Sequence, residues 1–228
     1  MEHSNPSMTE NFRANWERRR EIRPETMKSW TNNDWAKGRT RYLTFIVRVK
    51  EKKLVEKIRC IQKQLSSIPC VDPFPKDYFH ITVKGCGFLP ESPEHEDDIL
   101  IESLGTIIDQ ATDILCRSRF YIHLPKLNLF PSVVFLEVYD NGRIGELNRK
   151  LITIPQIRRT RFDHPSFLPH ISMAQFQNDR EFDRLISRLE RLRDVGFGEM
   201  TVGSIELVIA HLNGKYPELE SIHAFELE

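Results

Sequence analysis

The chain repeats one order of secondary structure at a spacing of 90 residues. Residues 42–49 and 132–138 are apolar runs typical of strands, and their first residues lie 90 positions apart. The strings His80-Ile81-Thr82 and His170-Ile171-Ser172 are separated by the same 90 positions. A duplicated unit explains this constant offset, and a duplication favours a fold of two similar lobes.

Both halves follow the order strand, helix, strand, helix, strand. Apolar residues at helical spacing predict helices at residues 53–65, 92–116, 144–151 and 178–192. Ser92 and Asn178 are the residues expected to start the second and the fourth of these helices. Further apolar runs predict strands at residues 120–124, 204–212 and 222–227. We expect an α+β fold in residues 42–228, with repeat halves at about 42–128 and 129–228. Each lobe would be an antiparallel sheet with helices on its outside, and a pseudo-twofold cleft would carry both histidine strings.

Each histidine string places an imidazole beside a hydroxyl. Residues i and i+2 of a strand point to the same face, so His80 lies beside Thr82 and His170 beside Ser172. With an ordinary pKa of about 6.5, one imidazole can accept a proton near neutral pH while the other donates one. The hydroxyls can donate hydrogen bonds to phosphoryl oxygens. The four residues, if the two strings face each other, predict a phosphate site with one group to accept and one to donate a proton.

A third string of the same form shows why one match alone is weak. His164-Pro165-Ser166 also places a hydroxyl residue two positions after a histidine. Proline is poorly tolerated inside a sheet, and no strand-like run surrounds it, so we interpret this segment as a loop. The two strings in the repeat differ from it because each lies in a predicted strand.

The motifs resemble those of the 2H phosphoesterase superfamily, most closely its RNA 2′,3′-cyclic phosphodiesterase and 2′-5′ RNA ligase-like branch. The similarity runs from about Tyr42 to the C-terminus and includes FHITVKG, LPHISMAQ with Pro169 before the histidine, and NGKYPEL with Gly214 and Tyr216. It implies a cyclic phosphodiesterase that leaves a 2′-phosphate, with 2′-5′ RNA ligation as the reverse reaction. The expected partner is an RNA end or a nucleotide, the expected cofactor is none, and the expected state is a monomer.

Two further residues are candidates for substrate binding. Lys84 follows Thr82 by two positions, so on a regular strand it shares the motif face and would add positive charge near the phosphate; the alternative is a solvated lysine at a sheet edge. By family resemblance, Tyr216 would stack on a base or ribose; otherwise it is a packing tyrosine.

Three other functions remain open. The first is a phosphodiesterase for 2′,5′-linked oligonucleotides or for another nucleotide cyclic phosphate. The second is a non-catalytic RNA-binding module. The third is a metalloenzyme, which is disfavoured because no carboxylate or cysteine stands at a ligand spacing beside either motif.

Composition agrees with a catalytic domain of the cytoplasm. Lys and Arg number 33 and Asp and Glu also 33, so RNA binding would need a local basic patch. No apolar run suggests a membrane span or a signal peptide. The four scattered cysteines suit a reducing compartment.

Residues 1–41 form a polar N-terminal extension outside the repeat. The extension contains all three tryptophans and the basic run Arg18-Arg19-Arg20. Its aromatic and basic residues could stack on and neutralise single-stranded RNA. We favour the other interpretation, in which the tryptophans dock the extension on the lobes by burying apolar surface.

Overall fold

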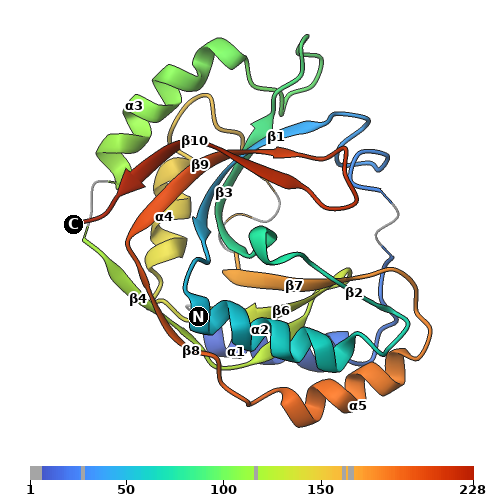
Figure 1. Ribbon diagram of the computed structural model, residues 1–228. Helices are drawn as coiled ribbons and strands as arrows, with labels where there is room; N and C mark the ends of the chain where they lie inside the picture. The colour runs from blue at the N-terminus through green and yellow to red at the C-terminus, as the bar shows by residue number, and fades with distance from the viewer. Residues whose placement is uncertain (1–6, 27–28, 116–117, 161–162, 164–166) are drawn as a thin grey trace, which may run out of the picture.

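The computed structural model describes residues 7–26, 29–115, 118–160, 163 and 167–228 (Figure 1). The α-helices within these residues are α1 (Met8–Arg19), α2 (Lys52–Leu65), α3 (Leu104–Leu115), α4 (Arg143–Leu151) and α5 (Phe182–Leu192), and two short 3₁₀ helices are η1 (Lys76–Tyr78) and η2 (Ile101–Ser103). The strands are β1 (Arg41–Arg48), β2 (Val71–Pro73), β3 (His80–Phe88), β4 (Phe120–Leu124), β5 (Leu127–Leu129), β6 (Val133–Glu137), β7 (His170–Phe176), β8 (Gly198–Val202), β9 (Ser204–His211) and β10 (Glu218–Glu226).

Eight strands form one antiparallel sheet that narrows in its middle. The order is β10-β9-β1-β3-β7-β6-β5, with β2 paired to β7 beside this path. Strands β3 and β7 meet near the centre of the molecule and share a single ladder pair, Ile81 with Ile171 (Figure 1). Strands β10, β9, β1 and β3 therefore form one lobe and β7, β6, β5 and β2 the other. The expected two-lobed α+β fold is confirmed.

Equivalent pairings on the two sides of this junction reflect the sequence repeat. Ile46 of β1 pairs with Thr82, and Phe135 of β6 pairs with Ser172. The junction pair itself joins two residues 90 positions apart. An approximate twofold axis therefore passes through the junction, and it relates the two motif strands to each other.

Each lobe nevertheless uses elements from both halves of the sequence. Strand β9 of the second half pairs with β1 of the first, and β4 of the first half pairs with β8 of the second in a separate sheet. Helix α2 packs against β7 of the second half, whereas α4 packs against β3 of the first. The lobes interlock as a result, and one hydrophobic core extends through both.

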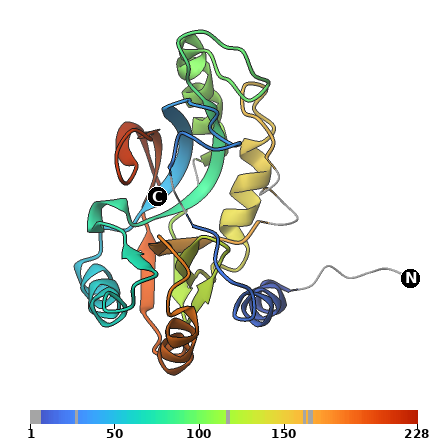
Figure 2. The same ribbon diagram turned by 90° about the vertical axis from the view of Figure 1, so that its right-hand side faces the viewer.

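The helices form where their apolar residues can face this core. In α2, Leu54, Ile58, Ile61 and Leu65 recur at helical spacing, and all four are buried. Helix α1 begins with a capping box between Ser7 and Glu10 and packs against β5. Figure 2 shows α1 in blue and α2 in cyan on opposite sides of the molecule. No helix in the described part of the chain is long and apolar enough to cross a bilayer.

Two predicted helices begin later than the sequence suggested. Helix α3 starts at Leu104 instead of near Ser92, because Arg39 holds the preceding segment in a loop through 2.6 Å bonds to Asp97 and Asp98. Helix α5 starts at Phe182, and the side chain of Asn178 accepts a bond from the Arg180 amide instead of capping the helix. The end predicted for the first of these helices, at residue 116, lies outside the described residues, as does the string at 164–166.

Candidate active site

The junction of β3 and β7 brings the four motif side chains to one face. Because Ile81 and Ile171 are antiparallel partners, His80 lies opposite Ser172 and Thr82 lies opposite His170. Opposite Cβ atoms in such a pair are about 5 Å apart, and the diagonal pair, here the two histidines, roughly 7 Å apart. Ile81 and Ile171 point to the other face and are fully buried, whereas the four motif residues are partly exposed.

Each histidine is held in one tautomer by its own strand. Nδ1 of His80 donates to the carbonyl oxygen of Tyr78 at 2.6 Å, and Nδ1 of His170 donates to that of Leu168 at 2.8 Å. A carbonyl oxygen can only accept, so the proton of each neutral ring is on Nδ1. Within the described residues, Nε2 of neither ring has a hydrogen-bond partner. Nε2 is therefore the atom of each ring that can exchange a proton with a ligand.

Burial favours the neutral form of both rings. Desolvation lowers the pKa of His80 to about 4; the bond to Tyr78 opposes this shift, and positive charge on His170 and Arg48 adds to it. Desolvation also lowers the pKa of His170, against the bond to Leu168. An anion bound between the rings would favour a protonated ring and so oppose both shifts.

Aromatic residues surround the two rings. Tyr78 contacts the His80 ring edge-on at 4.9 Å between centroids. Phe130 and Phe135 contact the His170 ring edge-on at 4.8 and 5.2 Å. These contacts exclude water from the sides of both imidazoles, which helps to lower the pKa of each, and they restrict rotation of the rings.

The two hydroxyl groups are free to bind a ligand. The side chains of Thr82 and Ser172 make no hydrogen bond within the part of the chain that the structure describes, and both residues are partly exposed. Each hydroxyl can rotate to donate to an anion. The face therefore offers two Nε2 atoms and two hydroxyl donors around one small area.

A β-bulge follows each motif directly and is held by a side-chain amide. Ladder pairing skips Val83 in β3 and Met173 in β7, so each is the extra residue of a bulge. The carbonyl oxygen of Val83 accepts from Nδ2 of Asn148 in α4 at 2.9 Å. That of Met173 accepts from Nε2 of Gln62 in α2 at 2.7 Å. Both amide side chains are buried. Helix α4 of the second half therefore fixes β3 just after the first motif, and α2 of the first half fixes β7 just after the second.

The first bulge turns Lys84 away from the motif face. Its side chain is fully buried, and Nζ donates to Asp163 at 2.9 Å and to the carbonyl oxygens of Arg158 and Gly85 at 2.7 and 2.5 Å. The alternation that placed Lys84 beside Thr82 assumed a regular strand, and the extra residue breaks it. The placement gives no support to a phosphate contact by Lys84, and the alternative of a solvated edge lysine is wrong. The contacts of Lys84 connect β3 to Arg158 and Asp163, which precede His170 in the chain.

Tyr216 lies at the outer end of a row of aromatic rings that reaches His80. Its hydroxyl donates to Asp72 at 2.7 Å, and its ring packs on Phe74 at 5.6 Å between centroids. Phe74 stacks on Tyr78 at 4.4 Å, and Tyr78 contacts His80. Two rings therefore separate Tyr216 from the histidine. Stacking of Tyr216 on a base or ribose stays a prediction.

Each histidine has a charged neighbour on the adjacent strand, basic for His80 and acidic for His170. Neither neighbour was among the site residues predicted from the sequence. Arg48 of β1 is the ladder partner of His80, and Glu137 of β6 is the partner of His170. Burial raises the pKa of Glu137, whose carboxylate accepts from Asn128, Tyr139 and Arg193. Each is a charged residue that ends a mainly apolar strand, and this is the signal that the sequence offers for them.

The N-terminal extension docks beside His170. Phe12 and Trp16 of α1 are buried, and the Phe12 ring lies 6.1 Å from the ring of Phe135 between centroids. The side chain of Asn15 donates to Asn128 at 3.0 Å. Trp30 packs against Phe74 and Tyr78 on the His80 side. These contacts agree with the docking interpretation for Trp16 and Trp30, whereas Trp35 is exposed although its ring contacts Phe88.

Within the residues that the structure describes, no group of three or more His, Cys, Asp and Glu side chains is arranged to hold a metal ion.

Comparison with known proteins identifies a family that matches most of this chain. A family model described as the 2′-5′ RNA ligase superfamily matches residues 49–214. No curated protein matches this sequence.

Solved structures share the fold at low sequence identity. The protein TT0787 of Thermus thermophilus is 22% identical with a TM-score of 0.61, over 82% of this chain and 97% of that one. LigT of E. coli, solved with 3′-AMP, is 14% identical with a TM-score of 0.62, over 82% and 98%. A conserved protein of unknown function from Agrobacterium tumefaciens, ATU0111, is 12% identical with a TM-score of 0.57, over 90% and 94%. The N-terminal helix α1 lies outside the family match.

Proposed function

This chain belongs to the 2′-5′ RNA ligase superfamily, and we propose that it is a metal-independent phosphodiesterase for RNA or nucleotide 2′,3′-cyclic phosphates that leaves a 2′-phosphate. The observation that carries the proposal is the single ladder pair Ile81–Ile171, because it places both motifs on one face. Family membership supports action on a phosphodiester bond. The cyclic substrate and the bond cleaved are the parts of the proposal that need experiment.

His80 and His170 would act as a general base and a general acid. One neutral Nε2 takes a proton from the attacking water as its oxygen forms a bond to phosphorus. The P–O bond to the 3′ oxygen breaks, and the other histidine, protonated when the anionic substrate binds, gives its proton to that oxygen. In the ligation direction the same two residues exchange roles.

Thr82 and Ser172 would bind the non-bridging phosphoryl oxygens. Negative charge increases on these oxygens in the transition state, and hydroxyl donors held by the strand backbone stabilise it without rearranging. The bulges and the buried amides of Gln62 and Asn148 would keep the donors in position. Solved complexes of LigT with 3′-AMP, ATP and NADP+ support a nucleotide as the ligand class.

Product analysis on a short RNA that ends in a 2′,3′-cyclic phosphate tests the proposal. We expect a 2′-phosphate product in the presence of a chelator. His80→Ala and His170→Ala should each lower kcat by about 10²–10⁴, because each removes one proton-transfer group. The matched control is His123→Ala, which removes a histidine exposed on β4 and should leave kcat unchanged.

Several results would contradict the proposal. A 3′-phosphate product would mean that the other ring bond is cleaved. Turnover of a 2′,5′-linked dinucleotide alone would favour the linear substrate. Tight binding of RNA without turnover would indicate a binding module, and loss of activity in chelator would indicate a metalloenzyme.

A further inference from the structure

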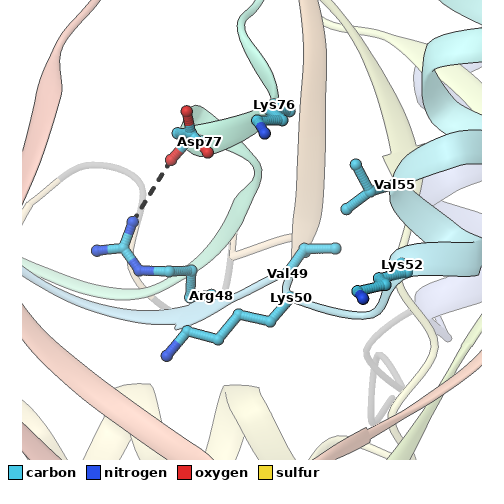
Figure 3. A pocket seen from close by; sticks show the side chains of 7 residues that line it. All are labelled: Arg48, Val49, Lys50, Lys52, Val55, Lys76 and Asp77. Carbon is cyan, nitrogen blue, oxygen red and sulfur yellow. Dashed lines mark hydrogen bonds between the residues drawn. The ribbon is translucent and has the colours of Figure 1, made fainter.

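A cavity with basic walls lies next to His80. It has a volume of about 280 Å³ and is formed by the end of β1, the start of α2 and η1 (Figure 3). Its lining residues are Arg48, Val49, Lys50, Lys52, Val55, Lys76 and Asp77. Four of these seven residues are cationic, and one is acidic.

The position of this basic pocket ties it to the candidate active site. Arg48 is the ladder partner of His80, so the two side chains leave neighbouring strands on the same face. Lys76 belongs to η1, which ends at Tyr78, two residues before His80. Arg48 also bonds to the carbonyl oxygen of Asp77 at 3.4 Å, which links β1 to η1 (Figure 3). A ligand held by His80 could therefore extend into the pocket.

Two of the four cations have no partner among the residues that the structure describes. Glu206 of β9 pairs with Arg48 at 2.9 Å and with Lys50 at 2.7 Å, which offsets part of their charge. Lys52 and Lys76 are exposed, and their side chains make no hydrogen bond or ion pair within the described residues. The carboxylate of Asp77 also lines the pocket. The two ammonium groups remain available to an anion.

The pseudo-twofold counterpart of this position has different neighbours. Beside His170, Glu137 stands where Arg48 stands beside His80. Helix α1 covers that side through the contact of Phe12 with Phe135. Glu137 is buried and pairs with Arg193 at 3.0 Å, so that cation is already partnered, unlike Lys52 and Lys76. A negatively charged group of the substrate, other than the reacting phosphate, would therefore be attracted to the His80 side.

We propose that the basic pocket binds a second phosphate group of the substrate, located on the 5′ side of the nucleoside that carries the cyclic phosphate. This inference rests on the proposed function. The volume is slightly below the roughly 300–1,000 Å³ of pockets that hold whole small molecules, so it suits one phosphate group better than a nucleotide. The second phosphate can come from an RNA chain, as an internucleotide phosphate, or from a 5′-phosphorylated mononucleotide.

The test compares substrates with and without the second phosphate. The substrates are adenosine 2′,3′-cyclic phosphate, its 5′-phosphorylated form and the dinucleotide ApA with a 2′,3′-cyclic end. The variant is Lys52→Ala with Lys76→Ala. The control is Lys53→Ala with Lys63→Ala, which removes two exposed lysines of α2 that do not line the pocket.

For substrates with a second phosphate, we expect the pocket variant to lower kcat/KM about tenfold, mainly through KM and less at high salt. For the substrate without it, kcat/KM should change less than twofold. If kcat/KM falls for both the 5′-phosphorylated form and the dinucleotide, the pocket binds a terminal as well as an internucleotide phosphate. If kcat/KM falls for the dinucleotide alone, the pocket binds the internucleotide phosphate of an RNA chain. Equal changes on all three substrates, or the same losses in the control, would overturn the proposal.

Binding separates failure of this proposal from failure of the proposed function. If the wild-type protein turns over none of the three substrates, the proposed function fails. The pocket is then tested by calorimetry with adenosine 2′,5′-bisphosphate and adenosine 2′-monophosphate. Weaker binding of the bisphosphate alone by the pocket variant, about tenfold, would uphold the second-phosphate site. Unchanged binding of both, or an equal loss for both, would reject it.

Discussion

His80 and His170 lie in related positions on the two motif strands, but their surroundings differ. His80 lies beside Arg48 and has a pKa lowered to about 4, whereas His170 lies beside the buried Glu137, and its pKa is lowered by burial. The ladder neighbour is thus a cation for His80 and, for His170, a carboxylate that pairs with Arg193. This difference suggests that the two imidazoles do not share the base and acid roles equally, although they come from a repeated motif.

The lowered pKa values predict an acidic optimum for kcat/KM. Catalysis needs one proton on the pair, and kcat/KM reports the free protein. Because both pKa values lie below the ordinary value of about 6.5, the singly protonated pair becomes rarer as pH rises through the range from 4 to 6.5. We expect kcat/KM to peak below pH 6.5. The maximum of kcat should lie at higher pH, because bound phosphate raises the pKa of the ring that holds the proton.

The measurement is kcat and KM for a cyclic mononucleotide from pH 4 to 9. Arg48→Met removes a positive charge beside His80 and should move the acidic limb of kcat/KM toward higher pH. The matched control, Arg13→Met, removes an exposed charge on α1 and should not move it. Activity that rises steadily into alkaline pH would contradict an imidazole pair.

At the scale of elements, α1 is an N-terminal helix that builds part of the site wall. The Trp16 side chain is buried and lies under the guanidinium of Arg193, 4.5 Å from the ring centroid. Arg193 in turn donates to Glu137, the neighbour of His170. The aromatic residues of α1 therefore serve packing, whereas Arg18 on the same helix is exposed.

Truncation of Trp16 should destabilise the protein. Trp16→Ala should lower the free energy of unfolding by about 3–5 kcal/mol, because it leaves a cavity between α1 and the core. Arg18→Ala should change it by less than about 0.5 kcal/mol. Urea unfolding followed by circular dichroism measures both. A Trp16→Ala midpoint equal to that of the wild type would mean that α1 is not part of the folded core.

At the scale of the whole molecule, the repeat halves are interlocked. Strand β9 completes the sheet of the first lobe, and α2 and α4 each pack on a motif strand of the other half. The motif face exists only where β3 and β7 pair at Ile81–Ile171. The site needs one motif strand from each half, and each of these strands is covered by a helix of the other half.

This arrangement predicts one cooperative unfolding transition. Calorimetric and van't Hoff enthalpies should agree, as expected for a single cooperative unit. A fragment of residues 42–128 should remain unfolded, because it lacks β9 and the helix α4 that covers β3. Two resolved transitions, or a folded fragment by NMR, would contradict interlocking.

The sequence by itself determined the features that depend on local pattern. Alternation along a strand puts His80 beside Thr82 and His170 beside Ser172, and the constant offset of 90 residues indicates a two-lobed α+β fold. Only the tertiary structure decided which residues lie opposite each other. The register of β3 on β7, the bulge that buries Lys84 and the loop that delays α3 until Leu104 all depend on partners far away in the chain. A local pattern carries no information about such partners, and for this reason Arg48 and the basic pocket beside His80 emerged from the fold alone.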